Sequence, residues 1–138
     1  MHTTMPDRDL ELAKLPVAKM QDVLLARFVA REEAAKLGYP PADLIRIATA
    51  VSEITRNVVQ HAGAAGAISF HRVQQDGRTG LRIVVTDGGC GIPDVNRALT
   101  GAGVPAGAGI PGARKLMNEV EIDSVSGHGT KVTMLKWL

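Results

Sequence analysis

Aromatic residues, cysteines and clustered charges are all scarce in this chain of 138 residues. Its two phenylalanines, one tyrosine and one tryptophan are too few for a surface on which nucleic-acid bases stack. The 16 lysines and arginines are scattered and the formal net charge is only +2, so no basic stripe indicates a nucleic-acid partner. The single cysteine, Cys90, excludes an internal disulfide and a cysteine-based structural zinc site.

Long apolar runs are also missing: none approaches the roughly 20 residues that a membrane-spanning helix needs. The stretch 1–14 contains Asp7, Asp9 and Glu11 and has no apolar core, so it is not a secretory signal. We therefore expect a cytoplasmic protein without a membrane partner. Its composition, 45% apolar and 22% charged, is typical of a soluble globular domain. We expect one domain over residues 9–138, after a frayed segment at 1–8.

Hydrophobic periodicity and turn residues predict the order of helices and strands. In chain order we expect a strand at 9–15, helices at 17–37 and 41–62, strands at 67–75 and 81–87, a helix at 111–118, and strands at 119–126 and 130–138. The helix at 41–62 has the clearest apolar stripe, formed by Leu44, Ile47, Val51, Ile54 and Val58. Grouped helices beside runs of strands predict an α+β fold, a two-layer α/β sandwich.

The first expected helix is apolar at Val17, Met20, Val23, Leu24, Phe28 and Ala35. We expect this strip to belong to the core. An exposed strip here would instead serve a dimer or a partner protein.

Glycine is abundant in one place: eight of the 15 glycines lie between Asp87 and Gly112. They follow the apolar run 81–86, which predicts a buried strand ending at the carboxylate of Asp87. Glycine is favoured where the backbone must approach a ligand closely, and successive free N–H groups can cradle phosphate oxygens. Upstream, Glu53 and Asn57 follow one another at a spacing of one turn on the helix at 41–62. The combination indicates a nucleotide site.

Each of these segments also has a simpler interpretation. The amide oxygen of Asn57 could supply one ligand to Mg²⁺, and Glu53 could accept a hydroxyl proton, but the pair could equally form a solvated polar face. Asp87 could accept a hydrogen bond from an exocyclic amine, or simply begin a tight turn. The glycines at 107–112 precede a helix whose N-terminus could hold an anion, although no Walker A sequence follows.

Four segments together resemble the GHKL (Bergerat-fold) ATP-binding superfamily, most closely its small bacterial switch kinases of the RsbT type. The segments are AVSEITRN at 50–57, TDGGCGIPD at 86–94, GAGIPGARKLMNE at 107–119 and SGHGT at 126–130. The resemblance extends over essentially the whole chain. It implies a sheet that is mixed but mostly antiparallel, with helices on one face.

The resemblance further implies an ATP-dependent protein serine/threonine kinase that uses ATP and Mg²⁺. In that family such a kinase phosphorylates a STAS-domain antagonist protein within a partner-switching stress or sigma-factor pathway. Carried over by position, Glu53 would be the general base and Asn57 would be the Mg²⁺ ligand. Asp87 would accept a hydrogen bond from the adenine amine, with Thr130 supporting it, and Gly89 and Gly91 would lie beside the adenine. Gly107 and Gly109 would supply the amides that bind the phosphates.

One segment departs from the pattern of that family. The stretch between Pro93 and Gly107, where the ATP lid would fall, is shorter than the resemblance leads us to expect, and it contains Val104 and Pro105. Proline removes an amide donor and restricts φ. This departure favours an alternative, a nucleotide-gated binding module with weak or no kinase activity, acting as an anti-sigma factor or as an activator of a PP2C-type phosphatase. A homodimer also remains compatible with the sequence.

Overall fold

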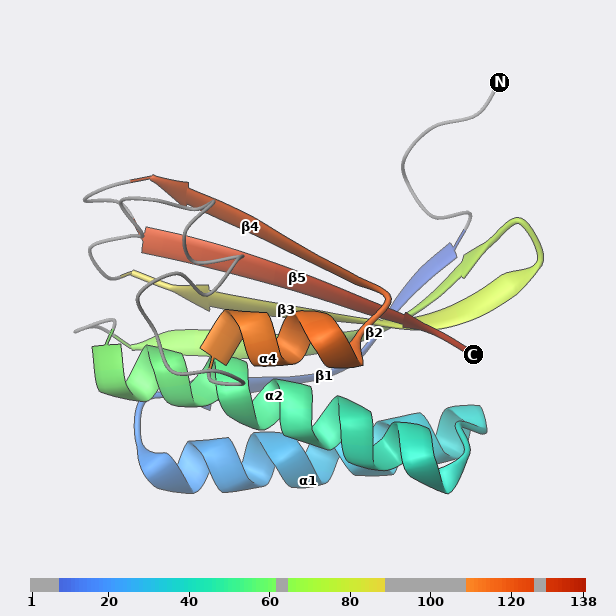
Figure 1. Cartoon of the computed structure of the whole chain (residues 1–138), viewed down its shortest axis with the longest axis horizontal. Coiled ribbons are helices and arrows are strands. Elements are labelled where there is room, and N and C mark those ends of the chain that lie inside the picture. Colours follow the sequence, from blue (N-terminus) through green and yellow to red (C-terminus); the bar gives the residue numbers. More distant parts are fainter. Residues whose placement is uncertain (1–7, 62–64, 89–108, 126–128) are drawn as a thin grey trace.

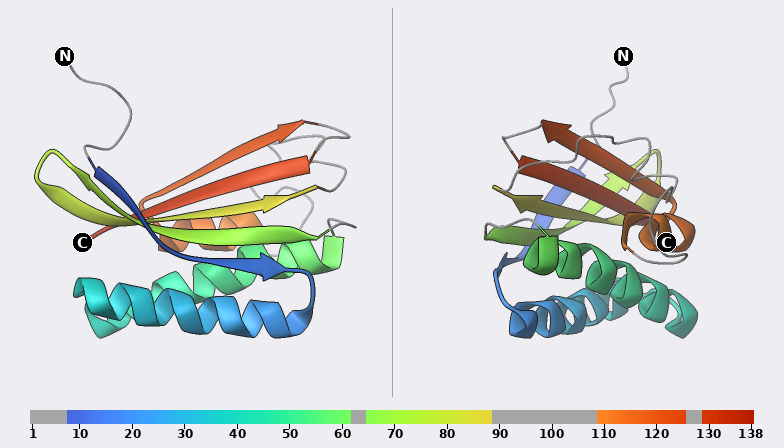
Figure 2. Two further views of the ribbon diagram at one scale, coloured as in Figure 1. Left: turned by 180° about the vertical axis from the view of Figure 1, so that it is seen from behind. Right: turned by 60° about the vertical axis from the view of Figure 1, so that its left-hand side comes forward.

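The computed structural model describes residues 8–61, 65–88, 109–125 and 129–138. Its elements are β1 (Arg8–Val17), α1 (Met20–Leu37), α2 (Pro41–His61), β2 (Gly66–Gln75), β3 (Arg78–Asp87), α4 (Gly109–Leu116), β4 (Glu119–Val125) and β5 (Gly129–Trp137). The strands form one sheet in the order β1-β2-β3-β5-β4, and the helices cover one of its faces (Figures 1 and 2). The predicted α+β two-layer sandwich is therefore confirmed.

The strand pairings in the described part of the sheet are all antiparallel, so the sheet is simpler there than the mixed one expected. The Asp-Gly pair at 76 and 77, a common turn sequence, joins β2 to β3, and both residues have positive φ, at 53° and 78°. Two such residues form the tight turn that matches the twist of neighbouring strands. Within the predicted frayed segment 1–8, only Arg8 is among the described residues, and it begins β1.

The first helix begins later than the sequence pattern predicts. Val17 ends β1, and α1 starts at Met20. The boundary is set by Asp22, whose Oδ2 accepts hydrogen bonds from the backbone N–H groups of Ala18 at 2.8 Å and Lys19 at 3.0 Å. Those two bonds satisfy donors at the helix start and lower the pKa of the Asp22 carboxyl.

The core lies between the inner face of the sheet and α2. The predicted stripe of α2 supplies Ile47, Val51, Ile54 and Val58, all buried. The facing strands supply Phe70, Ile83 and Met134, which are register neighbours on β2, β3 and β5 and are fully buried.

Helix α1 buries a different side from the one predicted. Its buried residues are Val23, Ala26, Ala30 and Ala34. Of the positions expected in the core, Val17 and Val23 are buried, but Met20, Leu24, Phe28 and Ala35 are exposed. Alanines allow α1 to pack closely on α2, so the larger side chains fall on the opposite side of the helix. Periodicity did not reveal this because α1 is apolar on both sides.

On the face of the sheet that none of the described helices covers, polar contacts connect the edge strand β1 to its neighbours. Asp9 of β1 lies 3.1 Å from Nδ1 of His71 on β2 and also pairs with Arg82 on β3. Nε2 of His71 in turn lies 2.9 Å from Oγ of Ser69. These contacts link β1, an edge strand of the sheet, to β2 and β3.

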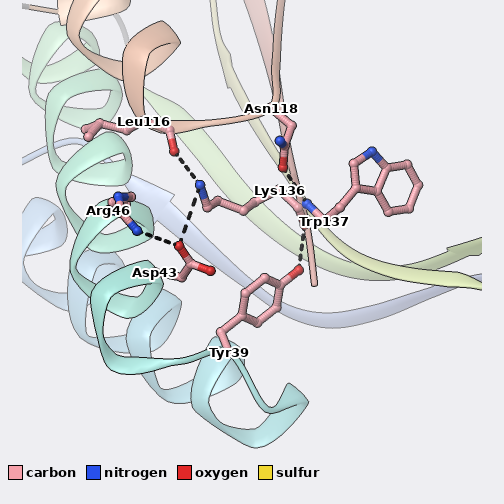
Figure 3. Close-up of polar contacts among 7 residues, drawn as sticks. All are labelled: Tyr39, Asp43, Arg46, Leu116, Asn118, Lys136 and Trp137. Atoms are coloured by element: carbon pink, nitrogen blue, oxygen red, sulfur yellow. Dashed lines mark hydrogen bonds and ion pairs between the residues drawn. The ribbon is translucent and has the colours of Figure 1, made fainter.

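A second polar cluster joins the helix layer to β5 (Figure 3). The hydroxyl of Tyr39 donates to the backbone oxygen of Lys136 at 2.5 Å. The ammonium of Lys136 donates to the backbone oxygen of Leu116, the last residue of α4, at 2.8 Å, and lies 3.8 Å from Asp43 at the start of α2. The cluster therefore fixes α4 relative to α2 at the end of the molecule near the C-terminus (Figure 1).

Candidate nucleotide site

At the other end of the sheet, β3 ends at Asp87 between two neighbouring strands. Asp87 is in register with Gly66 of β2 on one side and with Thr130 of β5 on the other. The hydroxyl of Thr130 lies 3.0 Å from that of Ser124 on β4. The structure therefore places Asp87 and Thr130 next to each other in the sheet, a position compatible with what the resemblance implies, and adds Ser124 as a neighbour of Thr130.

Two glycines allow the neighbouring strands to approach the end of β3. A Cβ atom at Gly66 would lie 2.1 Å from the backbone oxygen of Thr86. A Cβ atom at Gly129, whose φ is 101°, would lie 2.3 Å from the backbone oxygen of Asp87. Neither position admits a side chain unless the strand end moves. Sequence reasoning gave these glycines no role at the site, because their closeness to β3 depends on strand register.

Glu53 and Asn57 lie on a half-buried flank of α2 rather than on a solvated face. The Glu53 side chain is 23% exposed, and its Oε1 lies 3.4 Å from Nη1 of Arg56. Asn57, one turn further on, is also half-buried. The simpler interpretation of this pair as a solvated polar face is therefore disfavoured.

Buried hydroxyls on α2 explain how a helix with so many polar residues can occupy the middle of the layer. Ser52 donates to the backbone oxygen of Ala48 at 3.0 Å, and Thr55 donates to that of Val51 at 2.7 Å. Since both hydroxyls are satisfied within the helix, α2 can pack against α1 and α4 without leaving them unpaired.

The part of α2 that carries Asn57 lies against the strand end that carries Asp87. Val58, the residue after Asn57, is so close to Gly66 that a Cβ there would lie 3.1 Å from Val58 Cγ1. Figure 1 shows the end of α2, the start of α4 at Gly109, the end of β3 and the start of β5 at the same side of the molecule. The fold therefore brings described parts of all four motifs to one end, although the motif at 107–119 continues along α4 toward the other end.

Other predicted site residues lie outside the described residues. They are Gly89, Gly91 and Gly107, together with the expected lid between Pro93 and Gly107. Their proposed contacts with the base and the phosphates stay predictions.

The described residues include no group of three or more His, Cys, Asp or Glu side chains that could hold a metal ion by themselves. A single amide oxygen suits Mg²⁺, which usually keeps water molecules and substrate phosphates as its other ligands. Asn57, on the part of α2 that packs against this strand end through Val58, therefore fits a Mg²⁺–nucleotide complex. No helix in the described ranges is long and apolar enough to cross a membrane.

The sequence is similar to proteins of known activity along most of its length. It is 40% identical over 122 residues to the serine/threonine-protein kinase RsbT of Bacillus subtilis (strain 168), a match that covers 85% of this chain and 90% of that protein. It is 32% identical over 130 residues to the anti-sigma F factor of Caldanaerobacter subterraneus subsp. tengcongensis, covering 88% of this chain and 90% of that factor.

Solved structures share the fold. The RsbU and RsbW domains of Rv1364c from Mycobacterium tuberculosis match with a TM-score of 0.61 and 22% identity, over 91% of this chain and 32% of that one. The histidine kinase domain of the blue-light activated histidine kinase EL346 from Erythrobacter litoralis matches with a TM-score of 0.54 and 29% identity, over 70% of this chain and 45% of that one. The present chain thus spans less than half of each of these two structures.

The family model described as the histidine kinase-like ATPase domain matches residues 17–136. This range includes the four motifs on which the resemblance rests. The predicted superfamily is therefore confirmed, and the relative at 40% identity carries the serine/threonine kinase name that the motifs suggested. The chain belongs to the histidine kinase-like ATPase domain family.

Proposed function

We propose that this chain is a Mg²⁺-ATP-dependent protein serine/threonine kinase that phosphorylates a STAS-domain antagonist protein in a partner-switching pathway. The observation that carries the proposal is the position of Glu53 and Asn57, half-buried one turn apart on a helix packed against the strand end of Asp87. The 40% identity to the kinase RsbT supports the same reaction class.

Each candidate site residue named below has one role in this proposal. Asp87 accepts a hydrogen bond from the adenine amine, with Thr130 beside it on β5. Asn57 ligates Mg²⁺, which neutralises charge on the phosphates. Glu53 accepts the proton of the attacking serine or threonine hydroxyl, and Arg56 holds its carboxylate on the flank of α2. Phosphoryl transfer depends mainly on such positioning and charge neutralisation.

The proposal is tested by transfer of labelled γ-phosphate from Mg²⁺-ATP to purified STAS-domain proteins encoded beside this chain. We expect label on one serine or threonine of one such protein, located by mass spectrometry. If no STAS-domain protein is labelled while nucleotide binding is confirmed in the same sample, the kinase proposal is wrong.

A second candidate is a nucleotide-gated binding module that transfers little or no phosphate. It is favoured by the 32% identity to an anti-sigma F factor and by Val104 and Pro105 in the segment where the lid would fall. In this candidate the bound nucleotide selects a protein partner, a sigma factor or a PP2C-type phosphatase. Partner binding that differs between ATP and ADP, without labelling of any protein, would favour it over the kinase.

A further inference from the structure

The outward side of α1 carries a continuous row of large apolar side chains. Met20, Leu24, Leu25 and Phe28 are 47%, 64%, 47% and 61% exposed. Three of them follow one another every four residues, so they line up along the helix, with Leu25 beside them. Single exposed apolar side chains are ordinary, whereas a contiguous patch marks an interaction site. We call these four residues the α1 row.

The α1 row contributes little to the core of this chain. Helix α1 packs against α2 and β1 through its opposite side, where Val23, Ala26, Ala30 and Ala34 are buried. Burial of the row against another molecule would instead remove its apolar surface from water, which is favourable for binding.

Two arginines border the α1 row without a compensating charge. Arg27 and Arg31 are exposed and follow Leu24 and Phe28 by three residues each. No residue three or four positions away from either is acidic, and neither has an ion-pair partner among the described residues. Like charges four residues apart repel each other and destabilise a helix. Carboxylates on a partner would therefore offset the repulsion between Arg27 and Arg31. By contrast, three basic residues elsewhere on α1 and α2 pair with a carboxylate three residues earlier: Lys36 with Glu33, Arg46 with Asp43 and Arg56 with Glu53.

The α1 row also lies at the nucleotide end of the molecule. Val17, just before α1, is in register with Gly66, which is in register with Asp87. Since neighbouring strands lie about 5 Å apart, the start of α1 is about two strand spacings from the strand end of the site. Figure 2 shows α1 at the outside of the helix layer at this end.

We propose that the α1 row is a docking surface for a different protein, one whose contact surface is apolar and edged by carboxylates. A second copy of this chain is a less suitable partner for this surface. In a two-fold symmetric contact the same face of both copies meets, so each pair of arginines would face the other. On that side of α1, Glu32 is the one exposed carboxylate to set against Arg27 and Arg31. The proposal goes beyond the nucleotide chemistry and holds with or without phosphate transfer.

The test begins with a photo-crosslinking benzophenone side chain in place of Leu24, in the full chain expressed in its own cells. The same side chain in place of Glu121, exposed on β4, is the matched control. We expect position 24, and not position 121, to crosslink to a different protein, identified by mass spectrometry, at a segment that contains apolar and acidic residues. Crosslinks from position 24 only to a second copy of this chain, only to lipid or to no molecule would overturn the proposal.

The crosslinked protein is then purified and its dissociation constant is measured with variants of this chain. Phe28→Ser and Arg27→Glu should each weaken binding at least about tenfold, because exposed apolar anchors and their bordering charges dominate such contacts. Leu10→Ser, which changes a 50% exposed leucine on β1, should leave binding unchanged. Urea unfolding checks that each variant stays folded. Equal binding by Phe28→Ser and the unmodified chain would overturn the proposal.

Discussion

At the scale of single residues, Glu53, Asn57 and Asp87 could be selected as candidate site residues because their chemistry is visible in the sequence. Glu53 and Asn57 are a carboxylate and an amide one helical turn apart, and Asp87 lies between an apolar run and glycines. A nucleotide site is one function that accounts for both patterns at once. Tyr39 was not predictable, because its importance depends on contact with Lys136, which lies 97 positions later in the chain. Sequence patterns report neighbours along an element and carry no information on such a distant partner.

Tyr39 gives a prediction for pH dependence. Burial raises the pKa of the Tyr39 phenol from 10.0 to about 12. A raised pKa in the folded state means that the contribution of Tyr39 to stability is complete below pH 10 and is lost as the pH rises through about 12. Because Tyr39 is the chain's one tyrosine, its ionisation can be followed directly by ultraviolet absorbance.

We expect the tyrosinate signal of the native protein to appear near pH 12, and that of the urea-unfolded protein near pH 10. The unfolded sample is the internal control. A native midpoint near pH 10 would show that the phenol is not buried against β5.

At the scale of elements, the sequence predicts structure where one side of an element is distinctly apolar. Helix α2 is such a case, and its stripe is buried as expected. Helix α1 is not, because alanines on one side and large apolar residues on the other give no single preferred face. The turn at Asp76 and Gly77 was predictable from local turn chemistry. The packing of Gly66 and Gly129 against β3 was not, because it depends on strand register.

The end of β3 is tested by two alanine substitutions at glycines with positive φ. Gly129→Ala places a Cβ 2.3 Å from the backbone oxygen of Asp87, whereas a Cβ at Gly77, with φ 78°, meets nothing within 4 Å. Gly77→Ala should cost about 1–2 kcal/mol of unfolding free energy, the strain of a left-handed conformation alone. Gly129→Ala should cost more and should also weaken ATP binding, because it displaces Asp87.

Urea unfolding and calorimetric titration with ATP measure both effects. Gly77→Ala serves as the matched control, since it carries the backbone strain without the contact. Equal ATP affinity in the two variants would contradict the placement of the adenine at Asp87.

At the scale of the whole molecule, the two ends of the sandwich hold different groups of residues. The cluster of Tyr39, Asp43 and Lys136 joins α2, α4 and β5 near the C-terminus (Figure 3). The opposite end holds Asp87, Thr130 and the start of α1, from which the α1 row extends. We therefore expect the nucleotide and the protein partner to meet at the end of the molecule that is not held by this cluster.

The most direct test of the proposed kinase is the role of Glu53. Phosphate transfer to the labelled STAS-domain protein and ATP affinity are measured on the same preparations of the unmodified chain, Glu53→Gln and the control Glu121→Gln. We expect Glu53→Gln to keep its ATP affinity and to lose transfer by at least about 100-fold, the usual size of a general-base contribution. Glu121→Gln should match the unmodified chain in both. Equal transfer rates in Glu53→Gln and the unmodified chain would contradict the assignment of Glu53 as the general base.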